Sequence, residues 1–203
     1  MFELDHLAIS ATDLDDGAAS VSKLFGVPFQ SGGQHAAMGT HNQLLSLGDL
    51  YLEVISIDPS ADAPKWPRWF DLDEFTGAPC LSNWICRTEN LVEARKTLPE
   101  SGASVSIKRG DLRWKMAVPE DGKLPYDNCH PALIEWEGAL HPATMLTPQP
   151  LRLIRLSVYH PRADELEVQI APYLKDKRIE YVTRDTSGLE AEFETPSGTC
   201  VLT

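Results

Sequence analysis

Hydrophobic and polar positions along the chain change period repeatedly, and each change predicts a new element. Residues 3–10 alternate and predict a strand, and between Ala18 and Phe25 apolar residues recur at helical spacing. A glycine-rich loop at Ser31–Gly33 follows, and residues 42–47 and 51–57 then predict two strands. The first part of the chain therefore predicts one strand, one helix and further strands.

The same order of periods returns twice more. In the second unit the predicted elements are a strand at 81–87, a helix capped by Asn90, and strands at 104–108, 112–118 and 132–137. In the third unit they are a strand at 151–158, a helix through Leu166 and Ile170, and strands at 179–183, 189–194 and 199–202. A βαβββ order with a period of roughly 70 residues is too long for a solenoid repeat. We therefore predict an α+β fold of repeated βαβββ modules.

The predicted boundaries are a first module at 1–58, a linker at 59–79, a second module at 80–148 and a third at 149–203. The linker is rich in proline, but it also contains the aromatic residues Trp66, Trp69, Phe70 and Phe75. A flexible linker does not need large aromatic side chains. They either cap a cavity or pin the linker to the body of the protein.

Composition narrows the range of partners. The formal net charge is −12 and the pI is about 4.8, so the chain repels phosphate backbones and anionic membranes. No stretch approaches the roughly 20 apolar residues of a membrane span, and the N-terminus does not have the pattern of a signal peptide. The four cysteines are widely spaced and favour reduced thiols. We expect a cytoplasmic protein that binds neither nucleic acid nor membrane.

One motif occurs in full and then with its key residue changed. His6 begins a segment in which a strand turns through Thr and Asp into a helix, and Asn83 begins the corresponding segment of the second unit. If the site lies between duplicated modules, this replacement of histidine by asparagine decides much of its chemistry.

Several segments carry a resemblance that spans about residues 2–200. They are Leu4-Asp5-His6-Leu7-Ala8-Ile9, Gly32-Gly33-Gln34-His35, Gly39-Thr40-His41-Asn42, Tyr51-Leu52-Glu53-Val54-Ile55, Arg113-Trp114-Lys115, Leu124-Pro125-Tyr126, Ile134-Glu135-Trp136 and His141-Pro142. The pattern resembles the vicinal oxygen chelate superfamily, and within it the glyoxalase-like domain proteins. The resemblance implies paired modules in a curved, cupped mixed sheet. It also implies a divalent metal that is held by the first and fourth strands of each module and acts as a Lewis acid.

Carried over by position, the resemblance implies His6 and Glu53 as metal ligands, with Glu135 or Glu137, which share a face, from the second module and Asn83 as a weak fourth ligand. Of these, Glu53 and Glu135 are also the candidate catalytic carboxylates. Alternation supports a shared face for His6 and Glu53, since their neighbours Leu7 and Leu52 point the other way. Asn83 is a poor ligand beside imidazole, so this set departs from the His₂Glu₂ and His₂Glu patterns of characterised enzymes. The cofactor is Zn, Ni, Fe or Mn, or there is none.

Further polar residues are candidates for substrate binding: His35, Thr40, Asn42, Asn83 and Arg113. His35 lies beside two glycines, where a backbone can approach a ligand closely. Arg113 could hold a substrate carboxylate, although Trp114 and Met116 alternate with it and place it on the water-facing side. The alternative for the group from His35 to Asn42 is a solvated loop.

Two functions remain open. The first is a metal-assisted isomerase, lyase or dioxygenase that acts on a small oxygenated metabolite. The second is a metal-free protein that binds or sequesters a small molecule, as resistance proteins do. Since the superfamily places its site within one chain or between two chains, a homodimer is one of the expected assemblies.

Overall fold

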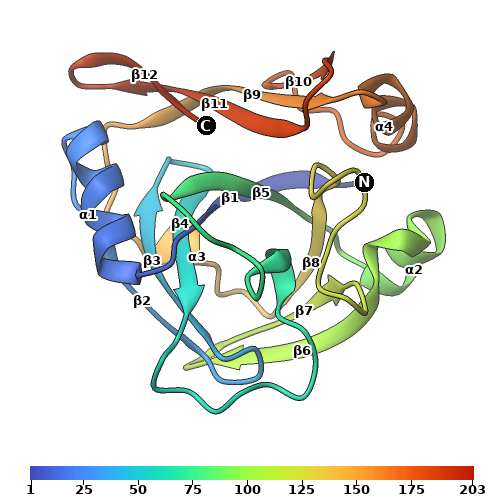
Figure 1. The fold of residues 1–203 in the computed structure, drawn as a ribbon, viewed down its shortest axis with the longest axis horizontal. Helices are drawn as coiled ribbons and strands as arrows, with labels where there is room; N and C mark the ends of the chain where they lie inside the picture. Colours follow the sequence, from blue (N-terminus) through green and yellow to red (C-terminus); the bar gives the residue numbers. More distant parts are fainter.

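The chain folds into two sheets that lie one above the other (Figure 1). The computed structural model describes residues 1–203. The first unit contains β1 (Glu3–Ser10), α1 (Leu14–Phe25), β2 (Gln30–His35), β3 (Thr40–Ser46) and β4 (Tyr51–Ile57), followed by a short 3₁₀ turn, η1 (Trp69–Asp71). The second contains β5 (Cys80–Arg87), α2 (Leu91–Thr97), the 3₁₀ turn η2 (Pro99–Ser101), β6 (Ala103–Arg109), β7 (Leu112–Val118) and β8 (Ala132–Glu137). After α3 (Pro142–Met145) come β9 (Arg152–His160), α4 (Ala163–Ile170), β10 (Ile179–Thr183), β11 (Gly188–Thr195) and β12 (Gly198–Leu202).

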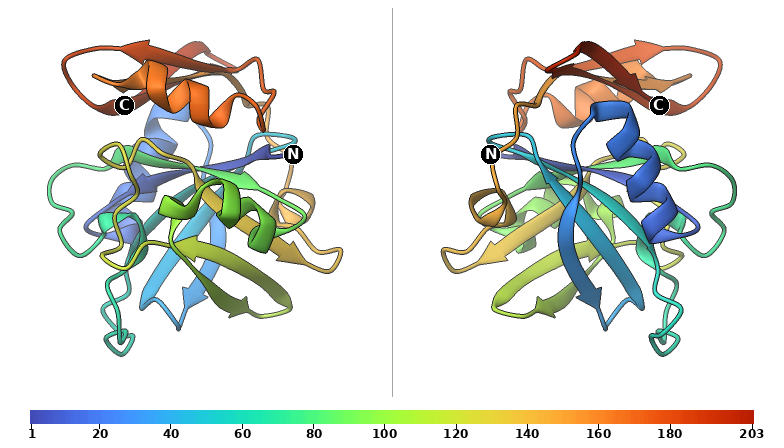
Figure 2. Two further views of the ribbon diagram at one scale, coloured as in Figure 1. Left: turned by 90° about the vertical axis from the view of Figure 1, so that its right-hand side faces the viewer. Right: turned by 90° about the vertical axis from the view of Figure 1, so that its left-hand side faces the viewer.

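The first two units share one curled sheet. Its strand order is β2-β3-β4-β1-β5-β8-β7-β6, so each unit forms half of it and the halves join at β1 and β5. Figure 2 shows the sheet curving into a cup, with α1 and α2 outside it. This confirms the predicted α+β fold of βαβββ modules in a cupped mixed sheet.

The join between the halves relates them by a local two-fold axis. In the antiparallel pair, His6 lies opposite Ile85 and Ala8 lies opposite Asn83. An axis between these pairs exchanges His6 with Asn83 and Ala8 with Ile85. The structure therefore aligns the two copies of the motif as the sequence predicts.

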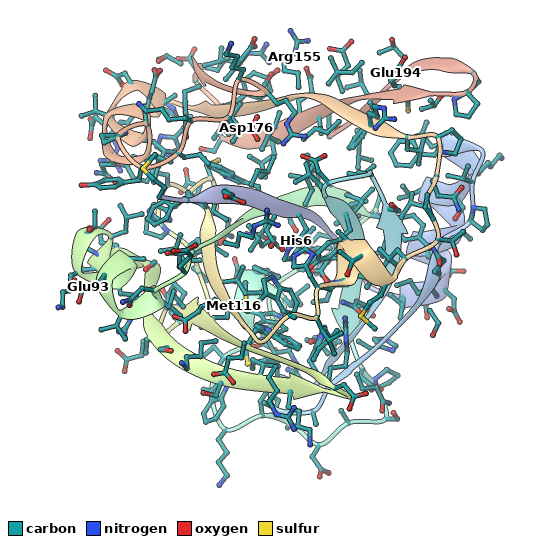
Figure 3. All side chains as sticks on the ribbon, turned by 180° about the vertical axis from the view of Figure 1, so that it is seen from behind. His6, Glu93, Met116, Arg155, Asp176 and Glu194 are labelled. Carbon is teal, nitrogen blue, oxygen red and sulfur yellow. The ribbon has the colours of Figure 1, made fainter.

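Alternation along each strand separates two hydrophobic clusters. Leu7, Leu52 and Trp84 belong to the cluster outside the cup, under the helices and the small sheet. Ala8 and Ile55, which lie on the opposite faces of β1 and β4, belong to the cluster inside the cup. In Figure 3 the labelled side chains of His6 and Met116 lie within the cup. A strand with a period of two presents one set of residues to each core.

The segment Ser31–Gly33 was predicted as a loop, and this prediction was wrong. It lies within β2, which pairs antiparallel with β3 and carries a register shift between Ser31 and Gly33. The sequence of β2 has no hydrophobic alternation from which a strand could be predicted, because Gly33 faces the Arg109 side chain at close range and not a hydrophobic core. A Cβ on Gly33 would lie 2.7 Å from Arg109 Cδ, so glycine allows this close approach of β2 to β6.

The third unit forms the small sheet, with strand order β10-β9-β11-β12 and α4 beside it. It covers the outer face of the large sheet, where the Tyr181 ring lies 6.4 Å from that of Trp84. The large outer cluster runs from α1 through β1 and β5 into this sheet. The third unit therefore closes the outer core and leaves the cup open on its inner side. No helix in the structure is long and apolar enough to cross a membrane.

Candidate functional site

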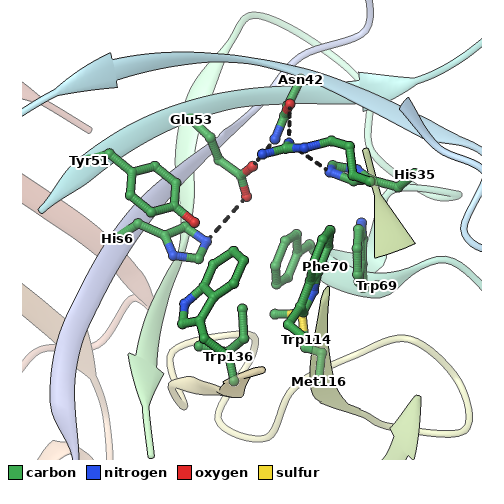
Figure 4. A pocket seen from close by; sticks show the side chains of 12 residues that line it. His6, His35, Asn42, Tyr51, Glu53, Trp69, Phe70, Trp114, Met116 and Trp136 are labelled. Atoms are coloured by element: carbon green, nitrogen blue, oxygen red, sulfur yellow. Dashed lines mark hydrogen bonds and ion pairs between the residues drawn. The ribbon is translucent and has the colours of Figure 1, made fainter. Parts of the chain in front are cut away.

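A pocket lies inside the cup, and both halves of the large sheet contribute to it (Figure 4). Twelve residues line it: His6, His35, Asn42, Tyr51, Glu53, Trp69, Phe70, Arg109, Trp114, Met116, Ile134 and Trp136. Its open volume is about 320 Å³, a figure that includes space continuous with the solvent. The pocket is therefore small.

Asp5 holds His6 in place at the base of the pocket. The Asp5 Oδ1 atom lies 2.6 Å from His6 Nδ1, and Asp5 Oδ2 accepts from Trp136 Nε1 at 3.1 Å. His141 Nε2 lies 2.9 Å from the same Oδ2. Strict alternation would point Asp5 and His6 to opposite faces. A register shift between Leu4 and His6 instead makes Asp5 the extra residue of a bulge, which re-aims its side chain.

The other ring nitrogen of His6 faces Glu53, as Figure 4 shows. Nε2 lies 3.5 Å from Glu53 Oε1, and the second carboxylate oxygen accepts from Asn42 Nδ2 at 2.7 Å. Burial alone lowers the pKa of His6, but its hydrogen bonds to the Asp5 and Glu53 carboxylates, together with their negative charges, outweigh burial and raise the pKa to about 9. For the Glu53 carboxyl, burial has the opposite effect and raises the pKa, but the hydrogen bonds that it accepts from His6 and Asn42 bring the pKa below its usual range. The pair is an imidazolium beside a carboxylate.

A second polar group adjoins this pair and centres on His35. Arg109 NH1 donates to Asn42 Oδ1 at 2.8 Å and lies 3.2 Å from His35 Nε2. Since a guanidinium has only donors, Nε2 accepts, and Nδ1 donates to Thr40 Oγ1 at 3.0 Å. Burial lowers the pKa of His35 to about 3, so its ring stays neutral.

Aromatic rings form the remaining walls of the pocket. The Trp114 and Trp136 rings lie 5.2 Å apart on β7 and β8. Trp69 stacks on Phe70 at 5.6 Å, and both come from the linker. The linker aromatics were expected either to cap a cavity or to pin the linker to the body of the protein. Trp69 and Phe70 cap a cavity, whereas Trp66 is 45% exposed. The walls suit a flat ligand that can pack against rings.

The structure brings together four of the predicted site residues and places the others elsewhere. His6, Glu53, His35 and Asn42 line the pocket, and Thr40 lies behind His35. His35 is on a strand, not on the solvated loop that was the alternative. Arg113 is exposed on the outer face of β7, as the alternation with Trp114 and Met116 indicated, and it does not line the pocket.

Glu135 also lies outside the pocket. Ala132 and Ile134 on β8 belong to the inner cluster, so Glu135 points to the outer face. There its Oε2 accepts from the Leu91 backbone N–H at 2.6 Å, and its Oε1 lies 3.3 Å from Lys115 Nζ. Glu135 therefore caps the N-terminus of α2, where a carboxylate is favoured by the free N–H groups.

The two-fold relation shows what replaces the expected second half of the metal site. Glu53 pairs with Ala8, and the residue that pairs with Ile85 in the same way is Ala132. Ala132 is thus the counterpart of Glu53, as Asn83 is the counterpart of His6. Asn83 is fully buried, and neither its Oδ1 nor its Nδ2 forms a hydrogen bond.

The donor set does not fit a divalent metal. His6 Nε2 and Glu53 Oε1 are the two suitable atoms in the pocket, since His35 Nε2 is occupied by a guanidinium. No group of three or more His, Cys, Asp or Glu side chains is placed to hold an ion. Metal sites in proteins use three or four protein ligands as a rule. A metal on His6 would also have to displace a proton that two carboxylates stabilise.

Sequence reasoning missed Asp5, Tyr51 and Arg109 as site residues, and it named Trp69 only among the linker aromatics that could cap a cavity. Arg109 could have been found, because it continues the inward alternation of Val105 and Ile107 on β6. Tyr51, which stacks on His6 at 4.3 Å, lies two residues before Glu53 on the same face of β4. Asp5 could not be found by alternation, because the bulge reverses its direction.

The fold and the pocket define a class: two βαβββ modules form one cup, with a polar site at its inner face. Comparison with sequence models of known families agrees with this class. The sequence model of a family described as "Glyoxalase-like domain" matches residues 4–174. The chain therefore belongs to the glyoxalase-like domain family, which confirms the predicted resemblance to glyoxalase-like domain proteins. No curated protein matches the sequence.

Solved structures resemble the chain at low sequence identity. A hypothetical protein from Staphylococcus aureus has a TM-score of 0.58 at 13% identity, over 99% of this chain and 84% of that one. Methylmalonyl-CoA epimerase from Mycobacterium tuberculosis has a TM-score of 0.44 at 20% identity, over 68% and 88%. The Streptomyces coelicolor epimerase in complex with 2-nitronate-propionyl-CoA has a TM-score of 0.46 at 15% identity, over 68% and 97%. The likeness to the Staphylococcus aureus protein, the one with a TM-score above 0.5 among these three, shows the fold alone.

Proposed function

We propose that this protein binds a small, flat, oxygen-bearing molecule in the cup without a bound metal ion. The observation that carries the proposal is the composition of the pocket. One ion pair and one amide network are enclosed by aromatic walls, whereas Asn83 and Ala132 stand where the second half of a metal site would be. This is the second of the two functions that the sequence left open.

The polar groups of the pocket suit recognition of ligand oxygens. His6, as an imidazolium, and Arg109 are donors, and Glu53 is an acceptor for a ligand hydroxyl. They are already oriented by Asp5, Asn42 and their neighbours, so little order has to be gained on binding. A few placed polar groups among aromatic walls are typical of small-molecule sites.

A second candidate is metal-free proton transfer, as an isomerase would need. The observation that favours it is the 3.5 Å approach of His6 Nε2 to Glu53 Oε1 in the lining of the pocket. The pKa directions oppose it. A general base works best with a pKa near the working pH, whereas the Glu53 pKa is lowered and the His6 pKa is raised to about 9. We therefore favour binding.

The proposal can be tested by screening small oxygenated molecules with metal-free protein. The protein is purified without a metal-binding tag, and binding is followed by ligand-observed NMR and by quenching of tryptophan fluorescence. Trp69, Trp114 and Trp136 line the pocket, so an occupant changes their emission. Tyr51→Trp enlarges a side chain that lines the pocket and stacks on His6, so it is expected to abolish binding, and exposed Arg113→Gln serves as the matched control.

Three outcomes decide the matter. Binding by metal-free protein that Tyr51→Trp removes and Arg113→Gln leaves intact supports the proposal. Binding that appears only after Zn, Ni, Fe or Mn is added overturns it in favour of the metal-assisted function. Isotope exchange into a bound ligand that Glu53→Gln abolishes would favour the isomerase instead.

A further inference from the structure

We propose that the pocket contains a carboxylate-binding subsite in which Arg109 of β6 and Trp69 of the linker hold the two oxygens of the ligand's acid group. This inference rests on the proposed function and narrows its ligand to a small organic acid. It also makes the segment 59–79 part of the binding site.

Arg109 is a charged group without an opposite charge. Its NH1 atom is used by Asn42 Oδ1 and His35 Nε2, both neutral acceptors. No carboxylate lies within ion-pair distance of the guanidinium, and its Nε and NH2 atoms donate to no protein group. Glu53, the carboxylate that lines the same pocket, is paired with His6 instead. A half-buried guanidinium with free donors is suited to two-point binding of a carboxylate.

Trp69 presents a second free donor to the same pocket. Its ring is 4% exposed and lines the pocket, yet its Nε1–H has no hydrogen-bond partner. A buried donor without a partner is costly, and an acceptor atom on a ligand would remove that cost.

Both residues that carry these donors contact His35. The Trp69 ring meets the His35 ring edge-on at 5.2 Å, and Arg109 NH1 lies 3.2 Å from His35 Nε2. The Trp114 ring packs on the same histidine at 5.8 Å and lies under the guanidinium carbon at 5.9 Å. Both donors thus border one wall of the pocket, as Figure 4 shows for Trp69 and His35.

The position of Trp69 is built into the structure. Phe70 and Asp71 adopt the left-handed conformation, with φ of 62° and 55°, which non-glycine residues rarely do. Asp71 N–H donates to Gly122 O at 3.0 Å, and its carboxylate lies 3.2 Å from Lys123 Nζ. These contacts offset the backbone strain and hold the indole inside the cup. Strain that the surroundings maintain in this way is common at ligand sites.

The experiment compares acids with their neutral isosteres, acetate with acetamide and benzoate with benzamide. Dissociation constants are measured by NMR titration for the full-length protein and for Arg109→Gln, Arg109→Lys and Trp69→Phe. Arg113→Gln and Trp66→Phe are the matched controls, because they change an exposed arginine and an exposed linker tryptophan. Near-ultraviolet circular dichroism verifies that each variant keeps its aromatic packing.

We expect the acid of a pair to bind about tenfold or more tightly than the amide, since hydrogen bonds to charged groups are the stronger kind. Arg109→Gln removes this preference and leaves the amide constant within about twofold, and Arg109→Lys restores part of it. Trp69→Phe weakens acid and amide alike by about two- to tenfold, because one neutral donor is lost.

Equal binding of acids and amides overturns the carboxylate assignment while the proposed function stands. A preference that survives Arg109→Gln overturns the role of Arg109. Identical constants for Trp69→Phe and Trp66→Phe overturn the role of Trp69. Failure of every probe in both pairs to bind overturns the proposed function, and this inference with it.

Discussion

Substitution of Asp5 by Asn should remove most of the pH dependence of stability on the basic side of neutrality. Asp5 is the strongest of the groups that raise the pKa of His6, against the opposing effect of burial. Asparagine keeps the shape of the side chain but not its charge. One of its three donors also loses its acceptor, so the variant is less stable at every pH.

The magnitude follows from the pKa of His6. A rise from 6.5 to about 9 corresponds to about 3 kcal/mol, at about 1.4 kcal/mol per unit. Because the folded state binds this proton more tightly than the unfolded chain, the stabilisation is complete below pH 6.5. It is lost as the pH rises to about 9. The wild-type free energy of unfolding should therefore fall by about 3 kcal/mol over this interval.

The assay is urea denaturation at half-unit steps of pH, combined with NMR titration of the His6 ring. In Asp5→Asn the His6 pKa should drop below neutrality, and the fall in unfolding free energy between pH 6.5 and 9 should shrink to less than about 1 kcal/mol. Glu194→Gln, which removes an exposed charge from the small sheet, is the control and should keep the wild-type slope. A wild-type stability that is flat over this interval, or the same slope in Asp5→Asn, would refute the reasoning.

Three further predictions address the other features of the site. Metal-free wild-type protein that is offered Zn, Ni, Fe or Mn should take up far less than one ion per chain by elemental analysis. The double variant Asn83→His with Ala132→Glu should take up about one ion per chain, because four ligands then face the cup. Stoichiometric uptake by the wild-type protein, without these substitutions, would contradict the symmetry argument. Glu135→Gln should lower the unfolding free energy by about 1 kcal/mol in urea denaturation, since it caps α2, and leave benzoate binding unchanged; weaker binding would place Glu135 in the site after all. Gly122→Ala would put a Cβ 2.0 Å from the Arg68 carbonyl oxygen, at a residue whose φ is 77°, so the substitution should displace the linker. It should therefore weaken benzoate binding in NMR titrations and lower the unfolding free energy by about 1 kcal/mol or more. Unchanged binding would show that the linker is not part of the binding site.

Local pattern was enough for the elements and for half of the site. The strands at 112–118 and 132–137 have the predicted bounds, and His6 and Glu53 share the cup face as alternation indicated. The strand β2 was not predicted, because it consists of glycine and polar residues that pack against the Arg109 side chain, and its sequence therefore has no hydrophobic period.

The errors within the site share one cause, the face on which a side chain lies. For Glu135 the sequence offered a suitable carboxylate, but the register of β8 sends Ala132, Ile134 and Trp136 inward instead. For Asp5 a single bulge turned a residue that alternation would place outside into the partner of His6. A shift of one residue moves a side chain to the other face, and no local pattern reports it.

By itself the sequence determined the βαβββ order, the family and the replacement of the second histidine by Asn83, because these depend on short-range periodicity and on residue identity. The tertiary structure decided which groups meet. The curl of the sheet carries Arg109, on the last strand in its order, to Asn42 and His35 in the first module, and the linker places Trp69 against His35. Such contacts join residues that are far apart in the chain, so they follow from the closure of the cup and from no single segment.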